Sequence, residues 1–592
     1  MPLGQLSKDG LNNKIWVGCP MSVDNRLDRL SSMLRRRGIV LPSFEIYGGV
    51  AGLVDYGPVG ARLKRKVNDA WIGHWSAIGN VVEVDSPTIT PEPVLVASGH
   101  VGEFNDQMSE CKECGSIFRS DHLLSELHPN PETLDSDEID LEMAKSVVKC
   151  PVCGSVEWKG ASPMNLMFRT QIGAMGEGRT AYMRPETAQG MFMLYPSLFR
   201  HFRQKLPFGA VQTGKGYRNE ISPRQGMIRL REFNMAEMEY FIDPKEPPCS
   251  DLETWTSELA LIPDPDGGNT GDKMMTIADA LAKGIVKHPT VAWFIAMTHE
   301  FLVDVGIDPE KIRFRQHAST EMAHYASDCW DCELFGEYGW VEAVGIANRT
   351  CHDLESHEAG SGSGLLRGWR KFNAPRRETR EVISPVGAIV GPAFKQRAAD
   401  VSEALSEMAE VPKDSQFSLK LKDGSVVEIS SDMFERRVEE VTIHGEFFTP
   451  HVIEPAFGID RIIWHILDHR FKEMEKDGEN YTILSLPQTV APIDIVVLPL
   501  FDKDGMGELS RDIYQSLISI KGVKSELDTS RSIGRRYARA DEIGIPWAIT
   551  IDHESIENGT ITVRRRDDQK QVRTGLAPLL ENIAKGTVDE FF

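Results

Sequence analysis

The sequence predicts an α+β protein followed by a separate C-terminal α/β domain. Two β-rich runs, PFGAVQTGKGYRNE and REFNMAEMEYFID, are joined by a Ser-Pro-Arg-Gln-Gly turn between residues 207 and 243. From Ala491 the pattern changes: IDIVVLPL and IPWAITI are continuous apolar runs typical of buried strands, with a helical segment at 508–520 between them. Such alternation of strand and helix predicts an α/β domain that begins near residue 490.

The earlier elements are predicted in chain order. Residues 1–40 form a leader that ends in a short basic helix from Arg26 to Arg37, and residues 41–60 form a loop rich in glycine and aromatics. Apolar spacing predicts a helix from Gly60 to Ser76, and Val81 to Val84 form a strand. Farther on, a loop at 263–272 precedes helical segments, a helix spans 398–409, and a hairpin turns at Lys422-Asp423-Gly424.

Length and composition indicate an ordinary globular protein. A chain of 592 residues accommodates about two to four domains, and 41% hydrophobic with 26% charged residues is typical of such proteins. The sequence has no apolar run of about 18 residues and no signal peptide. We therefore expect a cytoplasmic protein without a membrane partner.

The formal net charge of −22 at first argues against a nucleic-acid partner. Basic residues nevertheless cluster locally, at 367–380, at 531–539 and at 564–566. Local basic patches can bind RNA on an acidic protein, although each run could equally be a solvated surface.

Chemistry-bearing residues are concentrated in the two β-rich runs. Residues 218–239 hold Arg218, Asn219, Glu220, Arg229, Arg231, Glu232, Phe233, Glu237 and Glu239. Arginine binds phosphate, an aromatic face stacks on a purine, and carboxylates hold an ammonium group. The stretch therefore predicts a site where a nucleotide and an amino acid lie side by side.

Three motifs, RPETAQG, GYRNEISPR and REFNMAEME, together resemble class II aminoacyl-tRNA synthetases, specifically glycyl-tRNA synthetases of the archaeal and eukaryotic type. The resemblance runs from about Phe44 to the C-terminus. It implies a class II antiparallel sheet flanked by helices, within a catalytic domain at 41–486. Insertions are expected at 105–160, 244–310 and 372–440, and an anticodon-binding domain at 490–592.

The resemblance implies ATP-dependent activation of glycine and transfer of the glycyl group to tRNA(Gly). Neither step needs a protein nucleophile, so catalysis consists of positioning and charge neutralisation. Arg218, Glu220 and Arg461 are the implied catalytic residues. The implied ATP-binding residues are Arg218, Asn219, Glu220, Arg229, Leu230, Arg231, Glu232, Phe233, Asn234, Glu342, Ala343, Gly458, Ile459, Asp460 and Arg461. Mg²⁺ should bridge the ATP phosphates, with Glu342 and Glu333 as candidate ligands.

Glycine has no side chain, so its recognition depends on a small pocket and a fixed ammonium group. The implied glycine-binding residues are Arg119, Glu186, Phe233, Glu237, Glu342, Glu454, Ala456 and Gly458. Ala456 departs from the serine that is usual in the family; the alanine keeps the pocket small, so we expect specificity for glycine to survive. Several carboxylates close together require a cation or arginine partners.

Two Cys-x-x-Cys-Gly knuckles, Cys111/Cys114 and Cys150/Cys153, have 35 residues between them. Such knuckles predict structural zinc bound by four thiolates, although the spacer is longer than usual and the four could simply be reduced cysteines. A third Cys-x-x-Cys, Cys329 and Cys332, has no partner pair and is interpreted as buried strand.

The remaining implications concern partners. The helix and strand at 60–84 resemble the motif that forms the homodimer interface, although the tryptophan-bearing face of the helix could be ordinary core. Residues 530–544 resemble the shared anticodon-binding domain, so Arg535, Arg536 and Arg539 are expected to contact tRNA, with ion pairs inside the domain as the alternative. Two other functions are alternatives: a prolyl or threonyl synthetase, and a non-catalytic nucleic-acid-binding relative.

Overall fold

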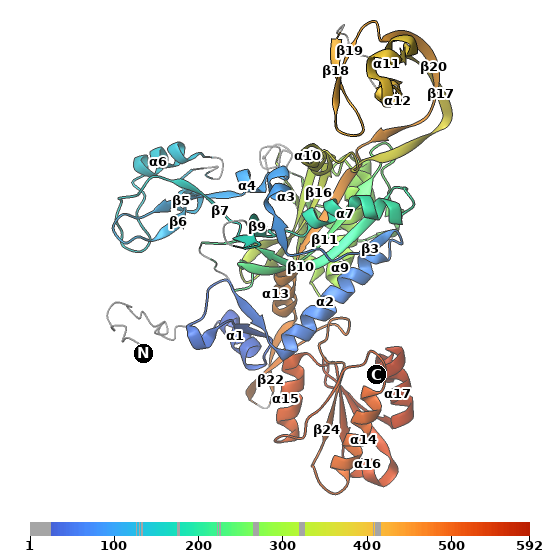
Figure 1. Cartoon of the computed structure of the whole chain (residues 1–592). Helices are drawn as coiled ribbons and strands as arrows, with labels where there is room; N and C mark the ends of the chain where they lie inside the picture. The colour runs from blue at the N-terminus through green and yellow to red at the C-terminus, as the bar shows by residue number, and fades with distance from the viewer. Residues whose placement is uncertain are drawn as a thin grey trace, which may run out of the picture. The chain divides into compact units, whose positions relative to one another are not determined.

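The computed structural model describes residues 25–592 except 126, 129–130, 132–133, 175–177, 222, 224–225, 264–270, 319–325, 407, 409–415 and 477 (Figure 1). Most of the predicted leader, most of the turn at 222–226, most of the loop at 263–272, the last residues of the predicted 398–409 helix and part of the acidic stretch at 131–142 lie outside the described residues. The chain divides into two compact units, one made of residues 1–366 and 450–592 and the other of residues 367–449.

A nine-stranded sheet forms the centre of the first unit. Its neighbours are antiparallel except for the β10–β3 and β12–β14 pairs, so the predicted antiparallel sheet is confirmed. The strands, in spatial order, are β13 (Lys273–Met275), β12 (Leu259–Ile262), β14 (Ile312–Gln316), β15 (Asp328–Gly336), β16 (Gly339–Thr350), β21 (His451–Gly458), β11 (Glu232–Ile242), β10 (Phe208–Tyr217) and β3 (Val81–Glu83).

The two faces of this sheet have different coverings, because side chains alternate along each strand. On the back face, Met238 and Tyr240 join a core built with α2 (Pro58–Ser76), α9 (Pro289–Asp304) and α13 (Ile459–Arg470). On the front face, Phe208 and Phe241 pack against α7 (Ala188–His201). Glu237 and Glu239 share the parity of Phe241, so the front face carries the carboxylates of β11.

Helix α2 covers the back face with its tryptophans. Trp71 and Trp75 are fully buried, with ring centroids 5.6 Å and 5.8 Å from that of Phe457, and Trp75 also lies 5.2 Å from Phe294. The tryptophan-bearing face is therefore core within one chain. A homodimer interface, as predicted, would therefore have to be formed by other residues.

Smaller elements surround the sheet. They are α1 (Arg26–Arg36), the pair β1 (Val40–Pro42) and β2 (Val54–Tyr56), the sheet of β4 (Ile89–Pro91), β9 (Arg179–Met183) and β8 (Arg169–Ile172), the helices α3 (Glu92–Ala97), α4 (His100–Glu103), α8 (Ile277–Ala282) and α10 (His352–Ser361), and the pair β22 (Phe471–Lys476) and β23 (Glu479–Leu484). The stretch with the cysteine pairs forms its own sheet of β6 (Ile117–Arg119), β5 (Asn105–Glu110) and β7 (Ser162–Asn165), with α5 (Ser120–Leu124) and α6 (Ser136–Lys145).

The C-terminal part has a five-stranded mixed sheet. Its order is β25 (Ser525–Leu527), β24 (Ile495–Pro499), β26 (Trp547–Ile551), β27 (Thr560–Arg565) and β28 (Gln571–Gly575). The helices are α14 (Met506–Ile518), α15 (Ile533–Ile543), α16 (His553–Asn558) and α17 (Leu576–Lys585). The predicted α/β pattern is confirmed, and both apolar runs are buried parallel strands.

The second unit has its own small core. A long antiparallel pair, β17 (Gly368–Pro385) and β20 (Phe434–Phe448), carries α11 (Gly387–Phe394), α12 (Ala398–Ser406) and the predicted hairpin of β18 (Gln416–Lys420) and β19 (Val426–Ser430). Ile383, Val401, Leu405, Ile429 and Phe434 are among the residues buried there. Across the residues that the structure describes, no helix has both the length and the apolar character needed to cross a membrane.

Candidate active site

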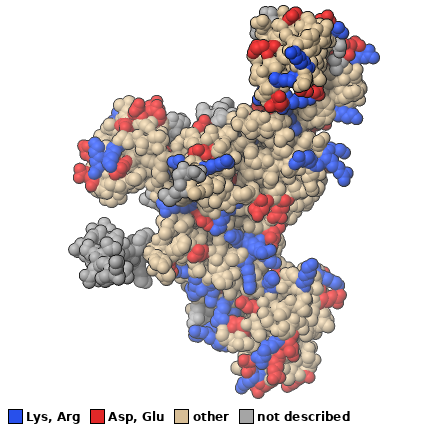
Figure 2. Space-filling model, viewed as in Figure 1, with Lys and Arg blue, Asp and Glu red and all other residues tan. Residues whose placement is uncertain are grey.

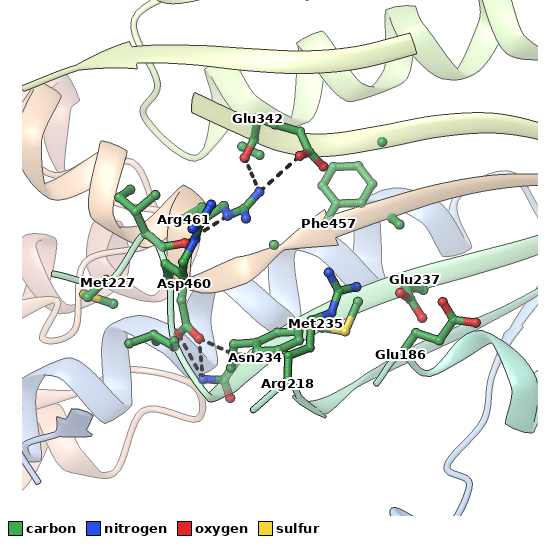
Figure 3. Close-up of a pocket in the computed structure, with 18 of the residues that line it drawn as sticks. Glu186, Arg218, Met227, Asn234, Met235, Glu237, Glu342, Phe457, Asp460 and Arg461 are labelled. Atoms are coloured by element: carbon green, nitrogen blue, oxygen red, sulfur yellow. Dashed lines mark hydrogen bonds and ion pairs between the residues drawn. The ribbon is translucent and has the colours of Figure 1, made fainter. Parts of the chain in front are cut away.

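A cavity of about 280 Å³ opens on the front face of the nine-stranded sheet (Figure 3). It is lined by Glu186, Arg218, Glu220, Met227, Ile228, Arg229, Leu230, Phe233, Asn234, Met235, Glu237, Glu342, Ala343, Gly345, Arg349, Glu454, Ala456, Phe457, Gly458, Asp460 and Arg461. Segments separated by more than 250 residues of sequence thus meet in one place. In Figure 3, Glu186 and Glu237 lie at one end, Arg461 and Glu342 lie toward the other, and Arg218 lies between them.

Arg218 is held by aromatic rings rather than by carboxylates. Its guanidinium carbon lies 5.2 Å from the centroid of Phe104 and 5.5 Å from that of Phe233. Its Nε is buried and has no hydrogen-bond partner within the described part of the chain. Phe233 can lie across β10 because the residue opposite is Gly216, where a Cβ would come within 2.7 Å of the ring. A cation fixed by stacking keeps its donors available for an anionic ligand.

Arg461 connects three of the segments. Its Nε donates to the Ile228 carbonyl at 3.1 Å, and its Nη1 donates to the Glu342 carbonyl at 2.6 Å. The Glu342 carboxylate lies 3.5 Å from the same Nη1, and about half of that side chain is exposed. The neighbouring Asp460 accepts from the Asn234 backbone at 2.6 Å and from the Tyr56 hydroxyl, so α13 is tied to β11.

The RPETAQG motif positions two carboxylates. The backbone N–H and the hydroxyl of Thr187 donate to Glu237 at 2.7 Å and 2.5 Å. The side-chain amide of Gln189 donates to Glu186 at 2.8 Å. Arg184 is buried and donates to the Lys215 and Ser86 carbonyls, which fixes the motif against β10.

The carboxylates of the cavity differ in charge. Burial raises the pKa of Glu237 to about 8, with Glu454 and Glu186 adding to the effect. Burial also raises the pKa of Glu454, although Arg349 opposes it. Burial acts the same way on Glu186, but His100, at 3.5 Å, and then Arg349 outweigh it, so the pKa of Glu186 lies below its ordinary value. The cavity therefore holds one firmly ionised carboxylate beside others that need a cation.

Arg349 is the main residue of the site that the sequence analysis missed. It is buried, donates to both carboxylate oxygens of Asp353 at 2.7 Å and 2.8 Å, and donates to Glu454 at 2.8 Å. An arginine inside the apolar run of β16 was the available signal, because buried charge requires a partner. His100, beside Glu186, was missed as well and carries no comparable signal in the sequence.

Several predicted site residues do not line the cavity. Arg231 donates to the Glu220 and Ala51 carbonyls, Glu232 pairs with Lys215, and Ile459 is fully buried in the core. The backbone N–H of Asn219 donates to the Leu166 carbonyl. Arg119 pairs with Asp106 and Asp121 in the insertion, and Glu333 pairs with Arg313 and Arg315 on β14.

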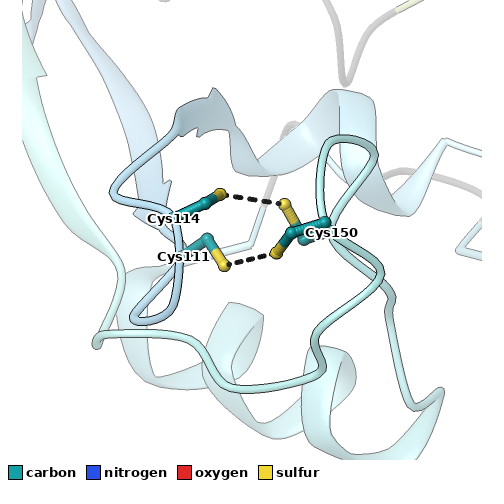
Figure 4. A group of neighbouring side chains, drawn as sticks. Cys111, Cys114 and Cys150 are labelled. Carbon is teal, nitrogen blue, oxygen red and sulfur yellow. Dashed lines mark hydrogen bonds between the residues drawn. The ribbon is translucent and has the colours of Figure 1, made fainter.

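The four cysteines of the two knuckles converge (Figure 4). The Sγ atoms of Cys111 and Cys153 are 3.6 Å apart, as are those of Cys114 and Cys150. Four thiolates around one tetrahedral zinc at about 2.3 Å would be about 3.8 Å apart, so the donor set and spacing fit that ion. The third pair lies in β15 as interpreted: Cys332 is buried in the core, and Cys329 has its thiol close to His317 and Asp331.

The predicted tRNA-contacting arginines have different surroundings. Arg535 is exposed on α15, whereas Arg536 is only 2% exposed and donates to the Pro499 and Asp528 carbonyls. Arg539 is half-buried and pairs with Asp528. The alternative of an ion pair inside the domain thus describes Arg539, whereas Arg536 is held by backbone carbonyls instead. Figure 2 shows Lys and Arg in several separate groups on the face drawn, with acidic groups between them.

A nine-stranded, mainly antiparallel sheet whose front-face cavity is lined by Arg218 and Arg461 is typical of class II aminoacyl-tRNA synthetases. Residues 169–259 match the tRNA synthetase class II core domain (G, H, P, S and T), and residues 494–586 match the anticodon binding domain. Glycine–tRNA ligases of Methanothrix thermoacetophila and Methanothermobacter thermautotrophicus are each 44% identical to this chain. The alignments cover 93% and 94% of this chain and 95% and 98% of those proteins. The chain belongs to the glycine–tRNA ligase family.

A solved structure gives the same fold at lower similarity. The prolyl-tRNA synthetase of Giardia lamblia, in complex with prolyl-adenylate, matches with a TM-score of 0.50 and 13% identity. The match covers 95% of this chain and 79% of that one. At that identity the match shows the shared fold only.

Proposed function

We propose that this chain is a glycine–tRNA ligase that joins glycine to ATP, forming glycyl-adenylate and diphosphate, and then transfers the glycyl group to the 3′ end of tRNA(Gly). The observation that carries the proposal is the meeting of Arg218 and Arg461 with Glu186, Glu237 and Glu454 in one cavity. A glycine ammonium group fits the carboxylate end, and the ATP phosphates fit the arginine end.

The geometry supports catalysis by positioning. An oxygen of the glycine carboxylate attacks the α-phosphorus, and the bond to the diphosphate breaks. Arg218, between the two ends of the cavity, neutralises the charge that develops on the α-phosphate, while Arg461 and Arg229 bind the outer phosphates. Phe233 offers a ring face to the adenine, and Glu220 its carboxylate to the exocyclic amino group.

Glycine is selected by charge and by size. Glu186, Glu237 and Glu454 would surround the ammonium group, and Ala456 and Gly345, paired across β21 and β16 on the cavity wall, would form the side of the subsite that excludes an amino-acid side chain. Ala456 keeps this limit without a hydroxyl group. Gly458 belongs to the same glycine subsite. Arg119 does not, because it forms ion pairs inside the insertion.

Two metals are part of the proposal. Mg²⁺ would be held by Glu342, which faces the cavity beside Arg461, rather than by Glu333, which already pairs with two arginines. Zn²⁺ would be held by Cys111, Cys114, Cys150 and Cys153, where four thiolates leave no open position and the ion is structural.

The remaining proposals concern partners and compartment. We propose Arg535 as a tRNA contact of α15, because its side chain is exposed. A homodimer is supported by the exposed apolar side chains that precede α2, namely Phe44, Ile46 and Tyr47, which are 58%, 91% and 86% exposed. The enzyme would act in the cytoplasm, where its tRNA substrate is used.

The test is amino-acid-dependent exchange between ATP and diphosphate, measured with each of the twenty amino acids. Exchange with glycine alone supports the proposal. Arg218→Gln should abolish this exchange, whereas Arg65→Gln, which changes an exposed side chain of α2, should leave it unchanged. Exchange with proline or threonine instead of glycine would show that this amino acid is the substrate. ATP binding without exchange, in protein with its metals and tRNA supplied, would favour a non-catalytic relative.

A further inference from the structure

Glu239 is a carboxylate that no step above uses. It follows Glu237 by two residues on β11, so both side chains point to the front face of the sheet. Across β10 its partner is Ala210, whose methyl group offers no hydrogen bond. Across β21, the pairs Glu237–Ala456 and Tyr240–Ile453 share one register, which brings Glu239 opposite Glu454.

The side chain is sealed from solvent. Glu239 is 0% exposed, and neither carboxylate oxygen has a hydrogen-bond partner within the described residues. An ionised carboxylate in such a place is very costly, whereas a protonated one costs only the desolvation of a polar group.

The charged groups that face Glu239 also favour its protonated form. They are Glu237 on its own strand, Glu454 on β21, Arg349 on β16 and Asp353 on α10. Arg349, the one cation among them, already donates to Asp353 and Glu454. Burial raises the pKa of Glu239 well above its ordinary value, and Glu454 adds to this, while Arg349 opposes it.

We propose that Glu239 is a positioning residue of the glycine subsite: a carboxyl group without charge that lies opposite Glu454 and beside Glu237, and that donates a hydrogen bond to one of these carboxylates when the glycine ammonium group binds. It does not touch glycine, because it is not among the residues that line the cavity. It fills the space with a polar group, yet adds no further negative charge to a pocket that one ammonium group must neutralise. This inference rests on the proposed function.

Three variants of the full chain separate the possible roles of Glu239. Glu239→Gln is neutral and has nearly the same shape, Glu239→Met has similar volume without polar atoms, and Glu526→Gln changes an exposed strand glutamate of the C-terminal domain as a control. Glycine-dependent exchange gives kcat and the KM values for glycine and ATP. Wild-type protein that shows no exchange with glycine would refute the proposed function before the variants are compared.

We expect Glu239→Gln and the control to keep the wild-type KM for glycine within about threefold, and Glu239→Met to raise it about tenfold with the KM for ATP unchanged. Equal losses in the Gln and Met variants would show that Glu239 acts as an ionised carboxylate and would overturn the inference. An unchanged KM for glycine in Glu239→Met, or equal changes in both KM values, would also overturn it. Should Glu239→Met fail to fold, infrared difference spectra of wild type and Glu239→Gln decide: a protonated-carboxyl carbonyl band absent from the Gln variant supports the inference, and its absence from wild type refutes it.

Discussion

Replacing Arg349 should both destabilise the catalytic domain and weaken glycine binding. The guanidinium forms three charge-assisted hydrogen bonds of 2.7–2.8 Å to Asp353 and Glu454. The side chains of Arg349, Asp353 and Glu454 are only 6%, 3% and 8% exposed. Arg349→Met would therefore leave two buried carboxylates without their cation, which typically costs about 3–5 kcal/mol.

Loss of Arg349 should also weaken the binding of glycine. Arg349 is the group that opposes the burial-driven rise in the pKa of Glu454. Without it, Glu454 is expected to take up a proton at neutral pH and to lose the charge that attracts ammonium. Arg349→Lys keeps the charge but cannot bind two carboxylates in the same forked geometry, so it should fall between wild type and Arg349→Met.

Urea denaturation followed by tryptophan fluorescence measures the first effect, because Trp71 and Trp75 lie in the core of the same sheet. Glycine-dependent exchange measures the second. Arg65→Met is the matched control: its partner Asp69 is 3.6 Å away, and the two side chains are 83% and 63% exposed. The control should behave as wild type. An unchanged unfolding midpoint and an unchanged KM for glycine in Arg349→Met would refute the reasoning.

Three other outcomes are expected. Glycine binds best when Glu237 is ionised, and the pKa of Glu237 is about 8, so the KM for glycine should fall by at most about tenfold per unit as pH rises from about 6.5 toward 8; a flat profile, the result expected of Glu237→Gln, would contradict this for wild type. Ala456→Ser should lower the KM for glycine about fivefold through one added hydrogen bond and still reject alanine, and alanine-dependent exchange equal to that with glycine would disprove the size argument. Metal analysis should find one zinc per chain, lost in Cys150→Ser together with protease resistance of residues 105–160 but kept in Cys249→Ser; wild-type protein without zinc would rule out the site.

Local patterns were sufficient for most elements. The apolar spacing of the 60–76 segment predicts α2 within two residues, and the continuous apolar runs 493–500 and 545–551 are the buried strands β24 and β26. These elements could be predicted because periodicity and turn residues are properties of neighbouring positions. The order of the nine strands could not be obtained in this way, and the resemblance implied only an antiparallel sheet flanked by helices.

Three arginines show which side-chain roles can be predicted from the sequence and which cannot. Arg535 and Arg536 are adjacent on α15, so they point about 100° apart and cannot share one RNA-binding face. Helical spacing alone could have separated them. Arg349 is different, because its role exists only where β16 lies beside β21, with Ala347 opposite Glu454. No pattern within either strand contains that contact.

The protonation of each glutamate in the cavity depends on its charged neighbours, so none of them can be understood from its own position in the sequence. Each would be an ordinary ionised residue if it were alone, yet burial and mutual repulsion raise the pKa values of Glu237 and Glu454, while His100 keeps Glu186 ionised. A small cation placed among them would reverse the repulsion and let all three bind at once. In the proposed function, binding energy is gained from a group that every amino acid carries, so exclusion of amino acids larger than glycine would depend on the cavity wall at Ala456 and Gly345. Affinity and specificity would therefore come from different residues. Substitutions of the glutamates should change the affinity for glycine, whereas substitutions of Ala456 or Gly345 should change the discrimination against larger amino acids.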